Sequence, residues 1–309
     1  MPLQGRLHEL ERRGHASTAR DAVPDVLWFS MSVVLILSSY VAGSRVGGGI
    51  APFVLGPAGI DPVLVPTTLF GRHPGWGTPG GGLVTAETME HMLDGIAEHG
   101  LFERAEAVLT GYFATPDQAE IAARAIDAVR EARGPDREPF VLVDPIIGDS
   151  DKGRFVSEEV ALAQASHLVP RADLVACNLW EFQHLAGPAE TLEQAAERAL
   201  ASDRNWMVGS IPFEGRIANL LVENGHVCAA AADIVPDPVP KGAGDLFKLV
   251  FLGQRLKGAT SPEALQRAVG AVEAVLMMAR VWRSRELPLA QCQSILANPP
   301  ESGYVVQCD

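Results

Sequence analysis

Cysteine is scarce in this chain, and runs of positive charge are absent. The four cysteines, at positions 177, 228, 292 and 308, form neither a CxxC pair nor a zinc spacing. The cysteine spacing therefore predicts no zinc site, and reduced cytosolic thiols are expected. The formal net charge is −13, with no run of Lys or Arg, so there is no electrostatic footprint for nucleic acid. No internal repeat is visible, and 309 residues suffice for one large α/β domain.

Charged residues are also missing from Val26 to Ser44, a stretch that approaches the length of a membrane span. Upstream Arg12, Arg13 and Arg20 would suit the basic start of a signal peptide. The stretch nevertheless contains Ser, Tyr and Gly. We therefore expect a buried strand at 33–37 and no membrane segment.

Strand and helix patterns alternate along the chain, which is typical of a parallel sheet. Asn224-Gly225 predicts a hairpin turn between two short strands. The Pro-rich run from Val235 to Pro240 cannot be an inner strand. Apolar spacing predicts helices at 85–99, 117–133, 192–201 and 263–283.

The segment Lys241-Gly-Ala-Gly-Asp245 precedes an apolar helix predicted from Leu246 to roughly Leu256. Glycine and alanine keep side chains out of the turn, so successive N–H groups can point at one anion beside the positive end of the helix dipole. A carboxylate beside bound phosphate is best explained if it accepts a proton. The pattern indicates phosphoryl transfer, with Asp245 activating a hydroxyl nucleophile. The alternative is that Asp245 only caps the helix.

Two other segments place polar residues directly after short apolar strands. Phe140 to Val143 is predicted to be a buried parallel strand, and Asp144 follows at its carboxyl end, where open α/β sheets bind ligands. Asn178 and Glu181 follow the next such strand with a spacing that puts both on one face of a helical turn. The alternatives are a turn aspartate at position 144 and a helix-capping pair at positions 178 and 181.

The order of these segments resembles the ribokinase-like kinase superfamily, and the flanking sequence resembles the pyridoxal kinase family. The similarity runs from roughly Val33 to Gly258. It implies an α/β fold, a three-layer αβα sandwich around a central, mostly parallel sheet. The segments that carry it are LILSSYV at 35–41, TTLFGRHPGWG at 67–77, LTGYF at 109–113, DPIIGD at 144–149, LVPRAD at 168–173, NLWE at 178–181 and GAGD at 242–245.

This resemblance implies a cytoplasmic homodimer that phosphorylates the 5′-hydroxyl of pyridoxal, or of a related B6 vitamer, with ATP and Mg²⁺. Asp245 would be the catalytic base. Gly242, Ala243 and Gly244 would form the anion hole for the transferred phosphate. The partners would be the small-molecule substrate and ATP, with neither nucleic acid nor a membrane.

The resemblance also implies the remaining site residues. Asp144 and Glu181 would lie near the ATP phosphates and supply carboxylates to the Mg²⁺. Ala176 and Lys241 would bind ATP as well. The pyridine substrate would be contacted by Ser39, His73 and Tyr112. The alternative for Tyr112 is a half-buried aromatic side chain at a strand end.

Several positions depart from the family pattern. Arg72 and Pro74 replace an Asn and a Thr around His73, so a substrate hydroxyl contact is lost, and residues 44–48 lack the family's His and Asn. Gly209 stands where the family has an ATP-contacting Lys. Losing a cation beside a triphosphate costs on the order of one to a few kcal/mol. Lys241 or Lys248 could restore it, or both could be ordinary solvated lysines.

These departures leave two other functions open. A kinase for another small hydroxymethyl heterocycle or sugar fits the altered loop around His73. A degenerate, non-catalytic homologue that binds a vitamer or a partner protein fits the loss of nucleotide and substrate contacts.

The resemblance also divides the chain. Residues 31–300 are expected to form one kinase domain, with 1–30 as an N-terminal extension and 301–309 as a C-terminal tail. Met31 is a candidate for the true start. The Gly-rich segment from Gly71 to Gly82 is expected to be a mobile flap over the substrate, the alternative being a disordered loop.

Overall fold

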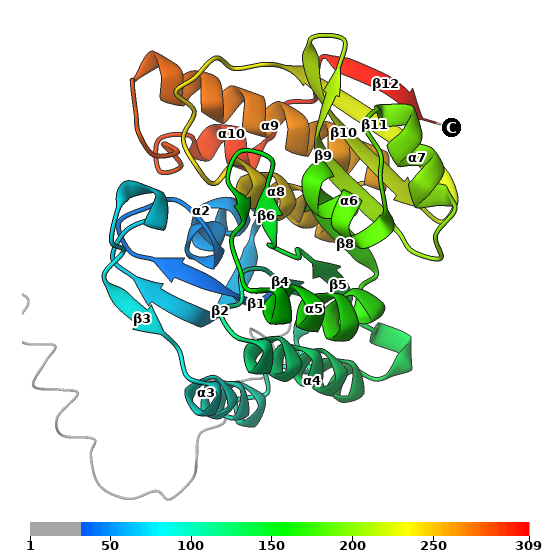
Figure 1. Ribbon diagram of the computed structural model, residues 1–309. Helices are drawn as coiled ribbons and strands as arrows, with labels where there is room; N and C mark the ends of the chain where they lie inside the picture. The colour runs from blue at the N-terminus through cyan, green and yellow to red at the C-terminus, as the bar shows by residue number, and fades with distance from the viewer. Residues whose placement is uncertain (1–31, 309) are drawn as a thin grey trace, which may run out of the picture. The chain divides into compact units, whose positions relative to one another are not determined.

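The structure, a computed structural model, describes residues 32–308. The predicted N-terminal extension and the candidate start at Met31 lie outside the described residues. A compact unit begins at Ser32. Its C-terminal end lies at the edge strand β12 (Figure 1).

A ten-stranded sheet in the order β12-β11-β10-β9-β8-β5-β4-β1-β2-β3 forms the centre of the unit (Figure 1). The six strands from β9 to β2 in this order are parallel, and the strands at both edges are antiparallel. A short separate hairpin, β6–β7, completes the strands of the described chain. The bounds are β1 Ser32–Val41, β2 Ile60–Phe70, β3 Gly81–Leu83, β4 Ala105–Thr110, β5 Phe140–Val143, β6 Gly148–Asp149, β7 Gly153–Arg154, β8 Leu174–Asn178, β9 Trp206–Phe213, β10 Arg216–Glu223, β11 His226–Asp233 and β12 Tyr304–Cys308.

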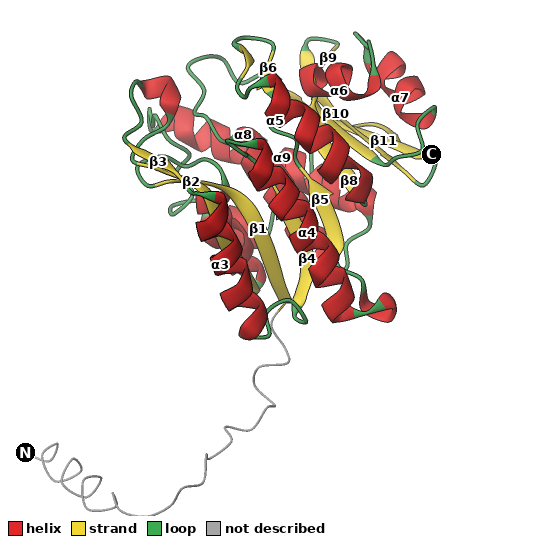
Figure 2. Cartoon of the chain, turned by 60° about the horizontal axis from the view of Figure 1, so that its bottom comes forward, coloured by secondary structure: helices red, strands yellow, loops and turns green. Residues whose placement is uncertain are grey.

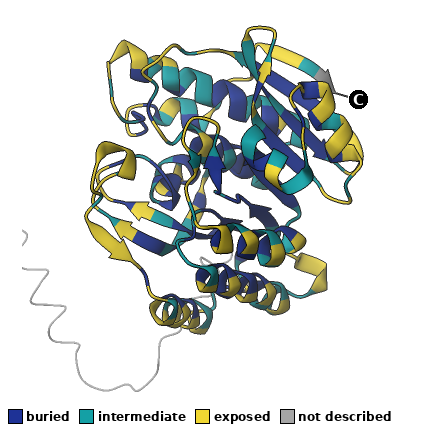
Figure 3. Ribbon diagram, viewed as in Figure 1, coloured by how far each residue is buried: buried dark blue, intermediate teal, exposed yellow. Residues whose placement is uncertain are grey.

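Helices cover both faces of the sheet, which gives the expected αβα sandwich (Figure 2). One apolar cluster packs α3 to α7 against one face, and a second packs α2, α8, α9 and α10 against the other. The strands between them are buried, and the outer helix faces are exposed (Figure 3). The bounds are α2 Ala51–Leu55, α3 Ala86–Glu98, α4 Pro116–Arg133, α5 Glu158–Ala163, α6 Leu179–Ala186, α7 Leu192–Leu200, α8 Ala243–Leu256, α9 Ser261–Val281 and α10 Gln293–Ala297.

The predicted helices and strands form where the local sequence signals place them. Thr85, Thr115, Thr191 and Thr260 each accept a hydrogen bond from the first turn of the helix that follows, which satisfies one donor that the helix itself leaves unpaired. The predicted hairpin is β10–β11, with its turn at residues 224–225 in the left-handed region. These expectations are confirmed.

Within the charge-free stretch from Val26 to Ser44, residues Ser32–Val41 form strand β1. Its residues 33–37 are at most 1% exposed, and the strand has parallel neighbours on both sides, β2 and β4. A strand covered on both faces can be apolar at every position, which explains the lack of charge. None of the helices at residues 32–308 is long and apolar enough to cross a membrane.

Two expectations about the C-terminal region are wrong. Residues 304–308, expected to be part of a tail, form strand β12, which pairs antiparallel with β11. Cys228 on β11, expected to be a reduced thiol, is disulfide-bonded. Cys177 and Cys292 are free and buried, as expected.

Candidate active site

The polar residues predicted from strand ends meet at one edge of the sheet. A small cavity there is bordered by the ends of β1, β4 and β5 and by the first turn of α8. Because parallel strands end on the same side of a sheet, side chains far apart in the sequence converge there. The polar and glycine residues that line this cavity include Ser38, Gly47, Gly111, Asp144, Asp245 and Lys248.

The GAGD segment forms the turn that starts α8. Gly242 is the N-cap residue with φ 97°, and a Cβ at this position would collide with the carbonyl oxygen of Arg45. Only glycine fits a left-handed position in such close contact. The first helical bond runs from Leu246 N–H to Gly242 O at 2.9 Å. The N–H groups of residues 243–245 therefore precede the helical ladder and form a ready anion site.

Asp245 is the third residue of α8 and does not cap it, so the capping alternative is wrong. Its Oδ2 accepts a hydrogen bond from the backbone N–H of Gly47, at 2.9 Å. Burial raises the pKa of Asp245 above the ordinary 3.8, and the Gly47 hydrogen bond and nearby Lys248 oppose this rise. The carboxylate is thus held in place while its affinity for a proton is increased.

Asp144, the residue after β5, is buried and pairs with a lysine from α8. The ammonium of Lys248 lies 2.5 Å from Asp144 Oδ1, and the two side chains are 12% and 3% exposed. Burial raises the pKa of Asp144 to about 7, despite the opposing charge of Lys248. Of the alternatives left open for Lys248, the ordinary solvated lysine is wrong.

Both carboxylate oxygens of Glu181 accept hydrogen bonds from backbone N–H groups. Oε2 accepts from Asn178 N–H at 3.0 Å, while Asn178 Oδ1 accepts from Glu181 N–H at 2.9 Å. Oε1 accepts from the N–H groups of Ile147 and Gly148, at 2.9 and 3.3 Å. The capping-pair alternative is therefore confirmed, and Glu181 also fixes the turn after Asp144.

This arrangement does not fit a divalent ion bound directly by the predicted pair. Magnesium requires several oxygen ligands in a near-octahedral shell. Asp144 already faces the ammonium of Lys248, and Glu181 accepts three backbone hydrogen bonds. Within residues 32–308, no group of three or more His, Cys, Asp or Glu side chains is spaced to hold a metal.

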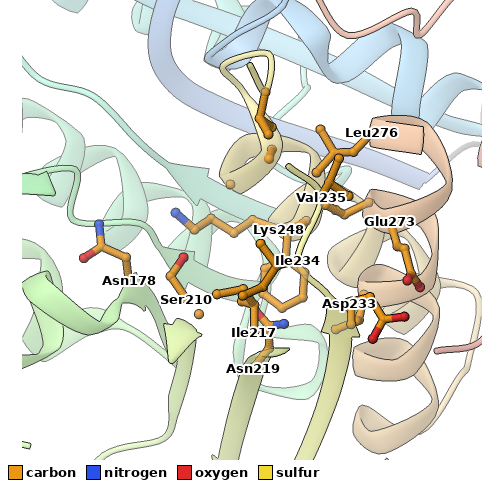
Figure 4. A pocket seen from close by; sticks show the side chains of 18 of the residues that line it. Asn178, Ser210, Ile217, Asn219, Asp233, Ile234, Val235, Lys248, Glu273 and Leu276 are labelled. Atoms are coloured by element: carbon orange, nitrogen blue, oxygen red, sulfur yellow. The ribbon is translucent and has the colours of Figure 1, made fainter. Parts of the chain in front are cut away.

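A larger cavity of about 280 Å³ lies beside the start of α8. Figure 4 shows apolar side chains such as Ile234, Val235 and Leu276 on its walls, with Lys248 extending toward the side that carries Asn178 and Ser210. Gly209 also lines it, so the departure from the family pattern lies on the cavity wall. An apolar pocket that ends at a helix N-terminus suits a nucleotide, with its base on the walls and its phosphates at the amides.

Ala176, predicted to bind ATP, does not line this cavity. It is fully buried in β8 and packs in the apolar cluster on the α8 and α9 side. Ala176 lies two residues before the carboxyl end of β8. The neighbouring Cys177 and Asn178 reach the cavity instead.

Of the other residues predicted to bind the substrate, Ser39 and His73 lie near Asp245, and Tyr112 N–H donates to Ser38 Oγ of the small cavity at 3.3 Å. A Cβ on Gly47 would collide with Ser39 Oγ, which places Ser39 beside the Gly47–Asp245 contact. Tyr112 is half-buried, and burial raises its pKa. Burial lowers the pKa of His73, and so do the charges of Lys152 and Lys241. The charge of Asp245 opposes this decrease.

The flap segment that carries His73 forms a turn between β2 and β3. His73 Nδ1 accepts a hydrogen bond from Gly75 N–H at 2.9 Å, and Arg72 Nε donates to Thr78 O at 2.8 Å. Pro74 starts a short 3₁₀ helix. These contacts favour a folded flap over a disordered loop, and mobility of the flap stays a prediction.

Sequence reasoning did not identify Gly47 or Lys152 as site residues. Gly47 adopts φ 64° and donates to Asp245 through its main chain, which no side-chain pattern reveals. Lys152, from the β6–β7 hairpin, lies close to the flap at Gly75. A glycine pair after the first strand was the one available signal for Gly47.

Comparisons with known proteins agree with this fold. A family model described as phosphomethylpyrimidine kinase matches residues 87–286. A pyridoxal kinase of Rubrobacter xylanophilus is 32% identical over 277 residues, which cover 86% of this chain and 94% of the relative. A pyridoxine/pyridoxal/pyridoxamine kinase of Bordetella avium is 29% identical, covering 87% of this chain and 94% of the relative.

Solved structures show the same architecture. Pyridoxal kinase from Entamoeba histolytica superposes with a TM-score of 0.81 at 23% identity, covering 90% of this chain and all of that chain. Pyridoxal kinase from Leishmania donovani, in complex with ADP and pyridoxamine, also gives 0.81, at 22% identity and 89% and 98% coverage. The predicted ribokinase-like fold is confirmed. With a matching family model and a relative at 32% identity over most of its length, the chain belongs to the pyridoxal kinase family.

Proposed function

We propose that this protein is a kinase that transfers the γ-phosphoryl group of ATP to the 5′-hydroxyl of pyridoxal. One observation carries the proposal: a carboxylate held by Gly47 lies beside unpaired amides at the start of α8. A proton acceptor next to an anion site is what transfer of a phosphoryl group to an alcohol requires.

In the proposed reaction, Asp245 accepts the proton of the substrate hydroxyl as the oxygen attacks the γ-phosphorus. A new O–P bond forms while the bond from the γ-phosphorus to its bridging oxygen breaks, and ADP leaves. The N–H groups of residues 243–245 stabilise the charge on the moving phosphoryl group. The raised pKa of Asp245 makes it a stronger base than an exposed aspartate.

We place the nucleotide in the 280 Å³ cavity. Apolar residues from α9 and from the segment after β11 surround its inner part, where a flat base would be desolvated. The phosphates would then lie at the start of α8. Lys241, which is exposed at the same turn, would act from the solvent side.

The vitamer would bind between Ser39, Tyr112 and the flap residue His73. The printed names of the relatives, pyridoxal kinase and pyridoxine/pyridoxal/pyridoxamine kinase, support this class of substrate. A second candidate is a hydroxymethylpyrimidine, which is favoured by the description of the family model and by the altered loop at Arg72 and Pro74.

The proposal has three further parts, which concern magnesium, the oligomeric state and the cellular compartment. Magnesium enters as part of the ATP complex, held by the nucleotide phosphates. The chain forms a homodimer, supported by exposed apolar side chains at Leu69, Trp76 and Leu83 near the β2–β3 edge. Sedimentation equilibrium tests the dimer, and a monomer would contradict it.

The protein acts in the cytoplasm, where ATP is available. The disulfide at Cys228 is the observation that speaks against a reducing compartment. Thiol titration of protein taken directly from cells under alkylating conditions tests this assignment. Four reactive thiols in the denatured chain support the cytoplasm, and a persistent disulfide contradicts it.

The experiment that tests the function is an ADP-release assay with pyridoxal, pyridoxine, pyridoxamine, hydroxymethylpyrimidine and ribose, with the product identified by mass. We expect the highest kcat/KM with pyridoxal. Turnover of hydroxymethylpyrimidine alone would favour the second candidate. Vitamer binding by calorimetry without any turnover would favour a non-catalytic binding protein.

A further inference from the structure

We propose that Lys248 is a built-in cation of the phosphate site, so that Asp144 and Glu181 are neutralised by an ammonium group and bind no metal ion. The inference rests on the proposed phosphoryl transfer. It assigns a role to a side chain that the transfer mechanism above does not use.

The position of the ammonium is unusual for a lysine. Lys248 lies one turn after Asp245 in α8, and its side chain is only 12% exposed. Its Nζ lies 3.9 Å from where a Cβ of Gly244 would be. Side chains on a helix lean toward its N-terminus, so the charge is brought back to the turn whose amides form the anion site.

The carboxylates around Lys248 are arranged for this ammonium. Asp144 Oδ1 is buried and has no hydrogen-bond donor in the described chain other than the ammonium 2.5 Å away. Asp144 lies against this ammonium, and the carboxylates of Glu181 and Asp245 also lie near it. Such neighbours favour the charged form of a buried lysine.

A divalent ion would compete unfavourably for the same oxygens. It would have to displace the ammonium from Asp144 or be placed beside it, and like charges in a poorly solvated site repel strongly. Glu181 could coordinate only by giving up backbone hydrogen bonds from Ile147, Gly148 or Asn178. A positive charge beside these buried acids is already covalently attached to the chain.

The consequence concerns the nucleotide. Lys248 lines both the nucleotide cavity and the small cavity beside Asp245, so its ammonium faces the junction where a γ-phosphate would be transferred. The protein supplies this positive charge at every metal concentration. The only magnesium required is the ion that ATP itself carries.

The test is Mn²⁺ binding to the nucleotide-free protein, followed by electron paramagnetic resonance. We expect wild type and Asp144→Asn to bind the same amount of Mn²⁺, all of it elsewhere on the acidic surface. Binding of one extra Mn²⁺ by wild type that Asp144→Asn abolishes would overturn the proposal. This measurement involves no vitamer, so its failure is distinguishable from failure of the proposed kinase activity.

A second Mn²⁺-binding test removes the ammonium group. Lys248→Met keeps an unbranched side chain of similar length but leaves the acids unneutralised. We expect this variant to gain one Mn²⁺ that the double variant Lys248→Met/Asp144→Asn lacks. Lys257→Met removes an exposed lysine at the other end of α8 and should bind Mn²⁺ as wild type does.

A third test measures how the rate of the wild-type enzyme depends on free Mg²⁺. At saturating MgATP, we expect the rate to stay constant as free Mg²⁺ increases. A rise of severalfold would show a second, protein-bound ion and overturn the proposal. Lys248→Met should lower kcat/KM for MgATP by roughly 10- to 100-fold, the usual worth of a charge-assisted contact, and an unchanged value would also overturn it.

Discussion

The backbone N–H of Gly47 donates a hydrogen bond to the carboxylate of Asp245, 198 positions further along the chain. Gly47 follows the first strand of the sheet, and Asp245 lies in the first turn of α8. The contact joins the side of the site predicted to bind the substrate to the turn predicted to bind phosphate. It fixes one carboxylate oxygen, so the other is free to face a hydroxyl group.

Replacing Asp245 by Asn tests the proposed base. Asn still offers an oxygen to the Gly47 N–H but cannot accept the substrate proton at neutral pH. We expect kcat to fall by about 10²- to 10⁴-fold, the usual contribution of general base catalysis, with ATP affinity by calorimetry nearly unchanged. An unchanged kcat would exclude Asp245 as the base.

Replacing Gly47 by Ala tests the contact itself. At φ 64° a Cβ would collide with Ser39 Oγ and the Ser39 carbonyl, so the loop has to move away from Asp245. We expect a loss of stability of about 1–3 kcal/mol and a reduced kcat. Gly59→Ala is the matched control, because Gly59 has φ 77° with open space around it. If both variants lose the same stability and neither loses kcat, the Gly47 contact does not position the base.

Filling the larger cavity should weaken nucleotide binding. Val272 on α9 lines the cavity, and a Trp at this position would occupy the space proposed for the base. We expect KM for ATP to rise by roughly tenfold or more, as overpacking typically costs 1–3 kcal/mol, while KM for pyridoxal stays unchanged. Met277→Trp, at a position 48% exposed on the same helix, should leave both values as in wild type. A rise in KM for pyridoxal alone would place the nucleotide elsewhere.

The buried Asp144 should make stability depend on pH. Burial raises its pKa to about 7 from 3.8, so between these values the folded state holds a proton that the unfolded chain releases. The free energy of unfolding therefore decreases as pH rises through this window. The contribution is at most about 4 kcal/mol, from ~1.4 kcal/mol per pKa unit.

Asp144→Asn removes this titration, and urea unfolding of both proteins across the window measures the difference. We expect the stability of the variant relative to wild type to increase with pH. A difference that is constant from about pH 4 to pH 7 would contradict the raised pKa. The ion pair with Lys248 exists only where Asp144 is ionised, so its loss in the variant is part of the same titration.

Local patterns in the sequence determined most of the helices, strands and turns of this protein. Apolar spacing and Asn224-Gly225 act within a few residues, so they predict elements without knowledge of the fold. The strand ends at Asp144 and Asn178 and the GAGD turn could be placed at one edge because parallel strands share their direction. The resemblance to pyridoxal kinases rested on these same segments.

Only the tertiary structure decided how the charges at that edge are paired. The sequence left Lys248 open between a solvated lysine and a replacement cation, and it left Glu181 open between a ligand and a cap. The assembled sheet buries Lys248 against Asp144 and surrounds Glu181 with backbone donors. The physical reason is separation along the chain. Lys248 lies about a hundred positions after Asp144, and the Ile147 and Gly148 donors lie 34 and 33 positions before Glu181, so local sequence patterns do not encode these contacts.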